Sequence, residues 1–327
     1  KPAATVRLTK TESVTVSQFQ KSIAALEAQA KRTLTKDERR QYLDVMIGNL
    51  LLLQAATRDN VVVSDAELKT SIANYEQQIG QAANLGRAMT DDELRQYLAG
   101  NGVTFDAFQK QLREQQTIVA YVKAKKKSMF DAVKAVTDQD IQDFYDANKA
   151  RFFMDDMVTL RHIYIDTRPL TNKDDRDKAS RRAADILREL KGGASFGDLV
   201  MKYSEDTKSK YRGGLLGTFF HNDQQSRQAL GSDFFDAIFK LKKGETSGVL
   251  QSNLGYHIVQ VSERLDARLL GLDDKVPPLN QGTVRDGIKN TILNQRQSET
   301  LNNALTSLVA DLRKQAEVKV FDDNLTW

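Results

Sequence analysis

The chain of 327 residues contains no cysteine. This absence excludes disulfide bonds and thiolate chemistry, and it is compatible with an oxidising compartment. Long apolar runs are absent too. Runs such as Leu50–Leu53 are far shorter than the roughly 20 residues that a membrane-spanning helix needs. The sequence therefore predicts no transmembrane segment.

Neither sign of charge dominates. The 48 Lys and Arg residues nearly balance the 44 Asp and Glu residues, for a formal net charge of +4. The densest basic cluster, Lys123–Lys127, is better explained as a solvated helix face than as a phosphate or lipid-headgroup site. Aromatic and basic residues do not alternate as they do in single-stranded nucleic-acid sites. We expect no nucleic-acid partner.

The motifs of metal and nucleotide enzymes are also missing. No glycine-rich phosphate loop precedes a helix, and the sequence contains no cluster of histidines and carboxylates. His221, one of only three histidines, is expected to be a surface residue. We expect no metal and no cofactor.

What the chain does contain, from about residue 15 to residue 152, is a series of helix-start signals. Each is a capping box, in which a hydroxyl accepts from an early backbone N–H and a Glu or Gln reaches back. The four strongest are Thr15–Gln18, Thr35–Glu38, Ser64–Glu67 and Thr90–Glu93, and Thr137–Asp140 is a weaker one. We expect about six helices here, preceded by a short strand between Thr5 and Val14.

The middle of the chain has a different composition. Ten of the eighteen glycines lie between Gly192 and Gly255, where tight turns and close backbone approaches are needed. Two runs rich in β-branched and aromatic residues predict strands, and three apolar-periodic segments predict helices. The strands are Val158–Ile165 and Tyr256–Val261, and the helices are Ala179–Leu190, Phe196–Tyr203 and Phe234–Leu241. The pattern predicts a small α+β unit.

The last part of the chain returns to a helical pattern. Val276–Pro278 is expected to be a linker, because paired prolines continue neither a helix nor a strand ladder. An apolar stripe follows, and Val318–Phe321 predicts a strand. The stripe consists of Ile288, Ile292, Leu301, Leu305, Leu308 and Leu312. We expect this segment to fold back onto the first helices, with its strand pairing near Val6.

The fold class predicted is therefore α+β, with a discontinuous, mainly helical domain and an inserted smaller domain. The expected boundaries are 1–152 for the first helical part, 153–265 for the insertion, and 266–327 for the helix and strand that complete the helical domain.

Several motifs between about residues 158 and 264 occur in the order found in the parvulin family of peptidyl-prolyl isomerases, which this region resembles. They are Arg161–Ile165, Gly193–Phe196, Tyr203–Thr207, Arg212–Gly217, Gly244–Gly248 and Gly255–Ile258. The outer segments resemble the SurA- and PrsA-like export chaperones, on softer matches at Val14–Phe19, Leu50–Ala56, Val63–Glu67 and Val318–Asp323.

The parvulin resemblance implies a catalytic set of His162, Asp206 and His257. Two interpretations of the histidines stay open: direct participation in catalysis, or a hydrogen-bonded pair that supports the pocket floor. Asp206 is either a polar partner of the rotated substrate carbonyl or a member of a polar loop. The resemblance also implies a proline slot, although some of its members are also plausible core residues. The slot would be lined by Leu216, Phe219, Leu230, Phe234 and Ser252.

The segment His221–Ala229 departs from the family, because it is longer and more polar than the usual loop. It puts catalytic strength in question. The loop from Thr167 to Lys178 mixes both signs of charge, so we expect no requirement for a phosphorylated substrate.

The function that the resemblances imply is a periplasmic or secreted folding factor that isomerises X–Pro bonds. Its expected partners are unfolded or partly folded exported polypeptides, with outer-membrane proteins among them. One alternative is a chaperone or interaction protein whose parvulin-like domain is weak or inactive and serves only for binding; another is a non-chaperone factor for one partner. The chain begins at Lys1, as a mature protein that has lost a signal or membrane anchor would, and as a shortened chain would.

Overall fold

The computed structural model describes residues 1–83 and 85–325. It divides into two compact units, which confirms the α+β class with an inserted domain. Residues 1–135 and 292–327 form the first, here called the terminal unit, and residues 136–291 form the second, the inserted unit. The domain boundaries expected at 152/153 and 265/266 stay predictions.

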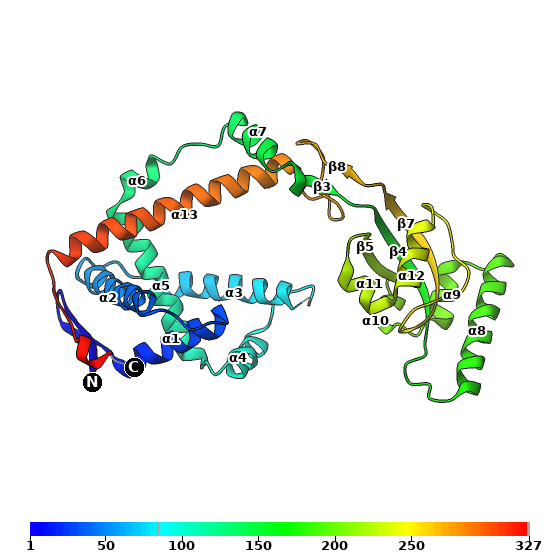
Figure 1. Ribbon diagram of the computed structural model, residues 1–327, viewed down its shortest axis with the longest axis horizontal. Coiled ribbons are helices and arrows are strands. Elements are labelled where there is room, and N and C mark those ends of the chain that lie inside the picture. Colours follow the sequence, from blue (N-terminus) through cyan, green and yellow to red (C-terminus); the bar gives the residue numbers. More distant parts are fainter. Residues whose placement is uncertain (84, 326–327) are drawn as a thin grey trace. The chain divides into compact units, whose positions relative to one another are not determined.

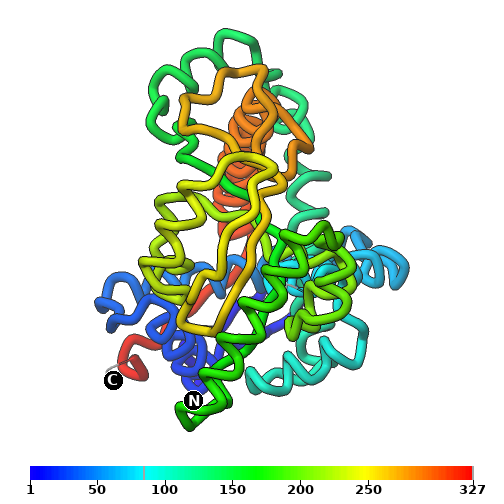
Figure 2. The backbone as a smooth tube through the Cα atoms, turned by 90° about the vertical axis from the view of Figure 1, so that its right-hand side faces the viewer, coloured from blue at the N-terminus to red at the C-terminus, as the bar shows by residue number. Residues whose placement is uncertain are grey.

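A three-stranded sheet joins the two ends of the chain in the terminal unit (Figure 1, Figure 2). Strand β1 (Pro2–Arg7) lies between β2 (Thr11–Thr15) and β9 (Glu317–Val320), and both pairings are antiparallel. Val6 is paired with Val318, so the expected pairing of the last strand near Val6 is confirmed.

The single strand expected between Thr5 and Val14 is instead the hairpin β1–β2. Its turn contains no Gly, Pro or Asn that could have signalled it. The backbone N–H groups of Leu8 and Thr9 are held by the side-chain oxygen of Gln54, at 2.9 and 3.0 Å. A distant side chain therefore fixes a turn that has no local signature.

Six helices follow the hairpin within the described part of the terminal unit. They are α1 (Val16–Ala30), α2 (Lys36–Arg58), α3 (Asp65–Ala82), α4 (Asp91–Gly100), α5 (Phe105–Lys125) and α6 (Lys127–Asp131). The capping boxes expected at Thr15, Thr35, Ser64 and Thr90 are confirmed. The sequence therefore marks the start of the first four helices correctly.

The core of the terminal unit collects the apolar faces of α2, α5 and the long helix α13 (Val284–Arg313) with the sheet. Ala304, Leu308 and Leu312 of α13 are buried in it, which confirms that the C-terminal segment folds back onto the first helices. The first two residues of the expected stripe, Ile288 and Ile292, are not part of this core, and Ile288 lies in the part of α13 that belongs to the inserted unit. A short 3₁₀ helix, η2 (Asp322–Asn324), follows β9.

The basic cluster near the end of α5 forms ion pairs. Lys125 pairs with Asp59, Lys126 with Asp311, and Lys127 with Asp131. This arrangement agrees with the solvated helix face expected from the sequence. None of the helices in residues 1–83 and 85–325 combines the length and the apolar character that crossing a bilayer requires.

The inserted unit is built around a four-stranded antiparallel sheet in the order β5–β4–β7–β6. The strands are β4 (Met157–Asp166), β5 (Leu215–Phe220), β6 (Leu250–Gln251) and β7 (Gly255–Leu265), and a small second sheet pairs β3 (Phe153–Met154) with β8 (Arg268–Leu269). The helices are α7 (Asp138–Ala147), η1 (Lys149–Phe152), α8 (Lys173–Lys191), α9 (Phe196–Tyr203), α10 (Thr207–Lys210), α11 (Gln224–Leu230) and α12 (Ser232–Lys240). Thr137 caps α7 with Asp140 as expected.

Different helices cover the two faces of this sheet (Figure 1). Ile163 and Ile165 of β4 pack against α8 and α9. Val158 and Leu160 of the same strand pack against α11 and α12. Because strand side chains alternate between faces, the even-numbered residues of β4 after Leu160 also point toward the α12 side, and this places the candidate site.

One segment expected to be irregular contains a helix, and the expected linker does not lie between the two units. The polar stretch His221–Ala229 contains α11, whose first turn is capped by the carboxylate of Asp223. The expected linker Val276–Pro278 lies within the inserted unit, next to a bridge between Lys275 and Thr283. Neither segment separates the two units.

Candidate active site

The two predicted histidines lie on adjacent strands and point to one face of the sheet. His162 is on β4 and His257 on β7, where His257 is paired with Tyr164. Both histidines are 2% exposed. The ring of Phe234, on α12, lies 4.7 Å from the ring of His257. Because side chains alternate between the two faces of a sheet, both imidazoles lie on the apolar face that α12 covers.

A continuous series of polar contacts links four of the predicted residues. The Nδ1 atoms of His162 and His257 are 3.1 Å apart. Nε2 of His162 lies 3.0 Å from a carboxylate oxygen of Asp206, and Nε2 of His257 lies 2.7 Å from Oγ of Ser252. The structure therefore brings His162, His257, Asp206 and Ser252 together.

The loop that carries Asp206 is fixed to β4 by its backbone. The N–H of Glu205 donates to the carbonyl of Tyr164, and the N–H of His162 donates to the carbonyl of Gly214, each at 2.8 Å. Gly214 has a φ of 82°, and a Cβ on it would stand 2.6 Å from the carbonyl oxygen of His162. Only glycine fits this approach, and the resulting contact holds Asp206 over His162.

The donors and acceptors in this series have one consistent arrangement. An ionised Asp206 only accepts, so His162 must carry its proton on Nε2 and leave Nδ1 bare. His257 then donates from Nδ1 to His162, and its bare Nε2 accepts from the hydroxyl of Ser252. The oxygen of Ser252 in turn accepts from the backbone N–H groups of Leu254 and Gly255, at 3.0 and 3.3 Å. In this arrangement every group of the series has a hydrogen-bond partner while both imidazole rings are neutral.

The pKa shifts favour this charge distribution. Burial lowers the pKa of His162, although Asp206 opposes the shift. Burial and the neighbouring His162 lower the pKa of His257 to about 3. Burial raises the pKa of Asp206, but hydrogen bonds led by those from Ser209 and His162 outweigh it, and the net shift is downward. Two neutral imidazoles and one carboxylate are therefore the resting state at neutral pH.

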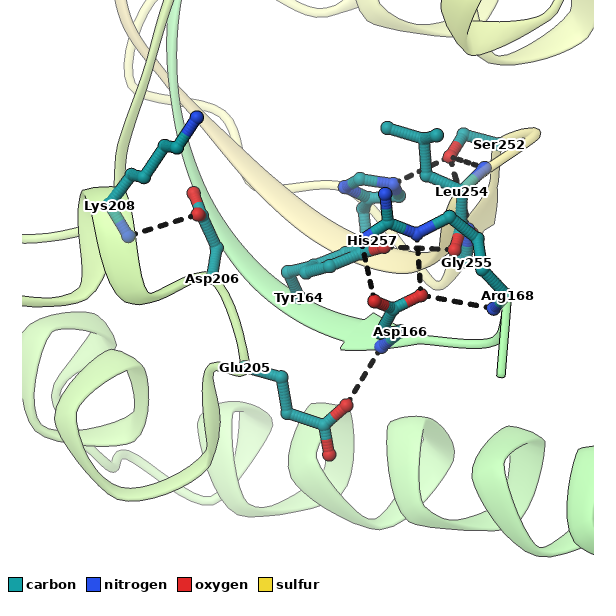
Figure 3. A network of polar contacts seen from close by, with 10 residues as sticks. All are labelled: Tyr164, Asp166, Arg168, Glu205, Asp206, Lys208, Ser252, Leu254, Gly255 and His257. Carbon is teal, nitrogen blue, oxygen red and sulfur yellow. Dashed lines mark hydrogen bonds and ion pairs between the residues drawn. The ribbon is translucent and has the colours of Figure 1, made fainter. Parts of the chain in front are cut away.

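Tyr164 adds a third ring on the same face. It stacks on His162 with ring centres 5.6 Å apart, and its hydroxyl donates to the carbonyl of Leu254 at 2.8 Å. Burial, with the nearby carboxylate of Asp166, raises its pKa to about 12. Figure 3 shows this ring beside His257 and Ser252, with Asp206 on the helix α10 side held by the N–H of Lys208. Tyr164 is thus a neutral hydrogen-bond donor that anchors Leu254, the residue before β7.

The apolar residues predicted for a proline slot all belong to the core cluster on the α12 face of the sheet. Leu230 and Phe234 are 7% and 1% exposed, whereas Leu216 and Phe219 on β5 are partly buried. Phe219 meets Phe235 edge to face. The structure therefore gathers the predicted set, with its deepest members tightly packed.

Two residues of the site were missed by the sequence analysis. Ser209 is 1% exposed, donates to the carboxylate of Asp206, and has its Oγ 3.1 Å from Nε2 of His162. It lies three residues after Asp206, so the one-turn spacing was its only signal. Tyr164 lies two residues after His162, and strand alternation could have indicated it. His221 takes no part; its ring meets Phe239 edge to face.

Comparison of the sequence with known families gives two matches. Residues 6–121 match the SurA-like N-terminal domain, and residues 144–265 match the PPIC-type peptidyl-prolyl isomerase domain. A foldase protein PrsA of Clostridium kluyveri is 26% identical over 298 residues, which cover 89% of this chain and 76% of the relative. A chaperone SurA of Methylobacillus flagellatus is 27% identical over 255 residues, which cover 78% of this chain and 54% of the relative.

Solved structures are similar at lower identity. One from a study of SurA-like chaperones of Campylobacter jejuni is 20% identical, with a TM-score of 0.38, and the match covers 97% of this chain and all of the other. A peptidyl-prolyl isomerase PrsA of Bacillus anthracis is 22% identical, with a TM-score of 0.28, over 82% of this chain and 97% of the other.

Proposed function

Since the chain is a SurA/PrsA-like chaperone with one parvulin-type peptidyl-prolyl isomerase domain, we propose that it isomerises X–Pro peptide bonds at the site formed by His162, His257 and Asp206. The observation that carries this proposal is the buried hydrogen-bond series that ends in the Asp206 carboxylate and runs beside the ring of Phe234. The rest of the proposal follows from what the reaction needs.

The reaction needs no nucleophile, metal or redox group. Rotation about an amide bond costs about 18–20 kcal/mol because it removes resonance, and an X–Pro bond therefore isomerises in tens to hundreds of seconds. A site accelerates it by binding the twisted amide more tightly than the planar one. An apolar surface holds the proline ring, and prearranged polar groups stabilise the twisted amide.

The residues of this chain meet these needs in distinct ways. Asp206 is the partly exposed end of the series, with a side chain 22% exposed, and is the group of the series that can contact a bound substrate. His162 and His257 hold that carboxylate and one another in a fixed tautomeric order. Of the four basic residues of the 167–178 loop, Arg168 pairs with Asp166, Lys173 with Asp177 and Lys178 with Asp175, while Arg176 donates to the carbonyl of Leu170. A phosphorylated substrate is therefore not required.

Isomerase turnover of the full chain on a short X–Pro peptide, measured with a protease-coupled assay, tests the proposal. Asp206→Ala is expected to lower turnover by about ten- to a hundredfold, the value of one or two hydrogen bonds to a charged group. Asp266→Ala, at an exposed carboxylate of the same unit, is the matched control and should leave turnover unchanged. An intact chain without turnover would contradict the proposal.

A second candidate is a parvulin domain that binds chains without catalysis. The observation that favours it is the burial of Leu230 and Phe234, which are 7% and 1% exposed and so act as core residues. In this case the wild-type chain would show a flat isomerase trace while still binding unfolded clients.

The chaperone part of the proposal concerns clients and place. We propose that the protein is periplasmic or secreted and binds non-native exported polypeptides, outer-membrane proteins among them. The support is the SurA-like match in the terminal unit and the relatives named foldase and chaperone. Light scattering of several unrelated unfolded clients tests it: the chain should suppress their aggregation. Tight binding to one folded partner, without such suppression, would identify a single-partner interaction protein instead.

A further inference from the structure

A cavity of about 410 Å³ lies in the inserted unit, apart from the candidate active site. Its size is within the range of about 300–1,000 Å³ that is typical of ligand pockets. Four phenylalanines and two deeply buried aliphatic side chains are among the residues that line it. These residues are Phe144, Phe152, Phe153 and Phe220, with Leu270 and Ile288. An apolar hollow of this kind in a soluble protein indicates a binding site.

Hydrogen bonds connect the segments that form the cavity. The N–H of Leu270 donates to the carbonyl of Phe152 at 2.9 Å. The buried hydroxyl of Tyr145 donates to the carbonyl of Leu270 at 2.7 Å, and its ring stacks on Phe152. On the other side, the N–H of Val284 donates to the carbonyl of Asp274 at 3.0 Å. The cavity is therefore preformed, which reduces the ordering cost of binding.

The rim carries one cation and one anion that are free to meet a ligand. Arg151 and Asp155 both line the cavity. Among the described residues neither forms an ion pair, and the one hydrogen bond of the Asp155 side chain is to the N–H of the next residue, Asp156. A small ligand with a net charge would meet a like charge at one of these groups. A peptide segment, which offers both carbonyl acceptors and N–H donors, complements both.

We propose that this cavity binds a large apolar side chain, aromatic for preference, of an extended polypeptide whose neighbouring peptide groups meet Arg151 and Asp155. Phenylalanine walls favour an aromatic guest through edge-to-face and offset contacts. Phe153, which is 58% exposed, and the exposed Val276 also line the cavity. This inference rests on the proposal that the protein holds non-native chains, and it supplies that activity with a defined site.

The cavity and the isomerase site are separate places on one unit. Phe220, which lines the cavity, pairs with Met157 at the first end of β4. His162 lies five residues further along that strand, roughly 16 Å at the usual rise of about 3.3 Å per residue. One client chain can therefore occupy both sites, and a ligand without proline should still bind at the cavity.

The test uses the full chain and a fluorescein-labelled, proline-free peptide with two phenylalanines among glycines and serines. Its dissociation constant is measured by fluorescence anisotropy. Gly287→Leu extends the cavity wall at a helical glycine where a Cβ would have no atom within 4 Å, and Phe153→Ser removes the exposed wall. Each is expected to weaken binding about tenfold, with isomerase turnover on a short substrate unchanged.

Two matched variants are the controls. Gly100→Leu also places a leucine at a helical glycine with open space around its Cβ, and Met201→Ser removes an exposed apolar side chain of the inserted unit. Both should bind the peptide within twofold of wild type. Equal binding by Gly287→Leu, Phe153→Ser and wild type, equal binding of a peptide with serine in place of both phenylalanines, or no binding at all would overturn the inference. Turnover and suppression of client aggregation that persist in that case would leave the proposed function standing.

Discussion

The two units bury polar side chains in different ways. Among the described residues, the terminal unit buries Gln54 and Glu76, and the inserted unit buries His162, Ser204, Ser209, Ser247 and His257. A buried polar group must find hydrogen-bond partners or lose stability. The kind of partner therefore distinguishes a structural role from a chemical one.

Gln54 is an example of the structural role. Its carbonyl oxygen accepts from the backbone N–H groups of Leu8 and Thr9, and its amide donates to Glu12 at 2.8 Å. These contacts attach the hairpin β1–β2 to helix α2. A side chain that accepts from backbone N–H groups in this way stabilises a turn that has no turn-forming residues of its own. This role requires no titratable group.

In the inserted unit, by contrast, three of the five buried polar residues bond to one another's side chains or to Asp206. They are His162, Ser209 and His257. The other two support the backbone: Ser204 accepts from the N–H of Tyr164, and Ser247 accepts from that of Val259. A stable fold does not require a buried series of titratable side chains that ends at a partly exposed carboxylate. We therefore interpret this series as the part of the molecule that carries out chemistry.

The largest effect that can test this contrast is expected for Gly214→Ala. The substitution puts a Cβ 2.6 Å from the carbonyl oxygen of His162, at a φ of 82°. Backbone strain and the steric clash together should cost about 2–5 kcal/mol and move the loop that carries Asp206. Hydrogen exchange should increase in peptides from β4 and β7 but not in peptides from α2, and isomerase turnover should be lost.

Gly193→Ala is the control for this prediction. Gly193 also has a positive φ, 101°, but a Cβ there would have no atom within 4 Å. Only the strain of about 1–2 kcal/mol should be observed. Equal destabilisation by the two variants would show that the close approach at Gly214 does not hold the site together.

The second-largest effect is expected when the pH is lowered from 6.5 to 5: the inserted unit should lose stability, and the terminal unit should not. All three histidines lie in the inserted unit, and burial lowers the pKa of His257 to about 3. Below pH 6.5 the unfolded chain takes up a proton on this histidine, while the folded chain keeps it neutral. His257 alone should therefore lower the stability of the inserted unit by about 1.4 kcal/mol per pH unit, or about 2 kcal/mol over this window, and His162, whose pKa burial also lowers, adds to the loss.

The terminal unit should not lose stability in the same window. Its carboxylates with lowered pKa values, such as Glu38 and Glu93 at about 2 because of hydrogen bonds from Arg32 and Arg87, lose their contribution only below about pH 4.5. Asp206 likewise acts only at lower pH. Hydrogen exchange, corrected for its intrinsic pH dependence, can compare β7 with α5. Parallel losses in both units would contradict the assignment to the buried histidines of the inserted unit.

The third-largest effect is expected in the terminal unit and should leave isomerase turnover unchanged. Gln54→Leu removes the partner of the N–H groups of Leu8 and Thr9 and of the Glu12 carboxylate. Unsatisfied donors should cost about 1–3 kcal/mol. Urea denaturation should report the loss, while isomerase turnover on a short peptide remains at the wild-type value. A fall in turnover would mean that the two units are not separable in this way.

Much of the fold could be predicted because its signals are local. Capping boxes such as Thr35 with Glu38 give helix starts, and period-two apolar runs give β4 and β7. The hairpin turn at Leu8–Lys10 and the start of helix α11 could not be placed in this way. The first depends on Gln54, a residue more than forty positions away. The second begins at the cap Asp223 within a polar stretch that has little apolar periodicity.

The grouping of His162, Asp206 and His257 could be expected from the family resemblance, and their catalytic role stays a prediction. What the sequence did not give was the order of the hydrogen bonds. Ser252 was expected at the edge of a slot, but its hydroxyl contacts His257, since the turn between β6 and β7 directs it there. Ser209 was missed because its role depends on a four-residue helix, α10, whose N-cap is Asp206 itself.

The smallest effect, and the sharpest distinction between structure and chemistry, is expected for Ser209→Ala. The variant removes one donor to the Asp206 carboxylate, so the pKa of Asp206 should rise and turnover should fall about two- to tenfold. Ser247→Ala removes a buried hydroxyl that serves only the backbone, with Val259 and Gly248 as partners, and is the matched control. Both should lose similar stability in urea. Only Ser209→Ala should shift the acid limb of the turnover–pH profile to higher pH, and the same shift in both variants would reduce Ser209 to a packing residue.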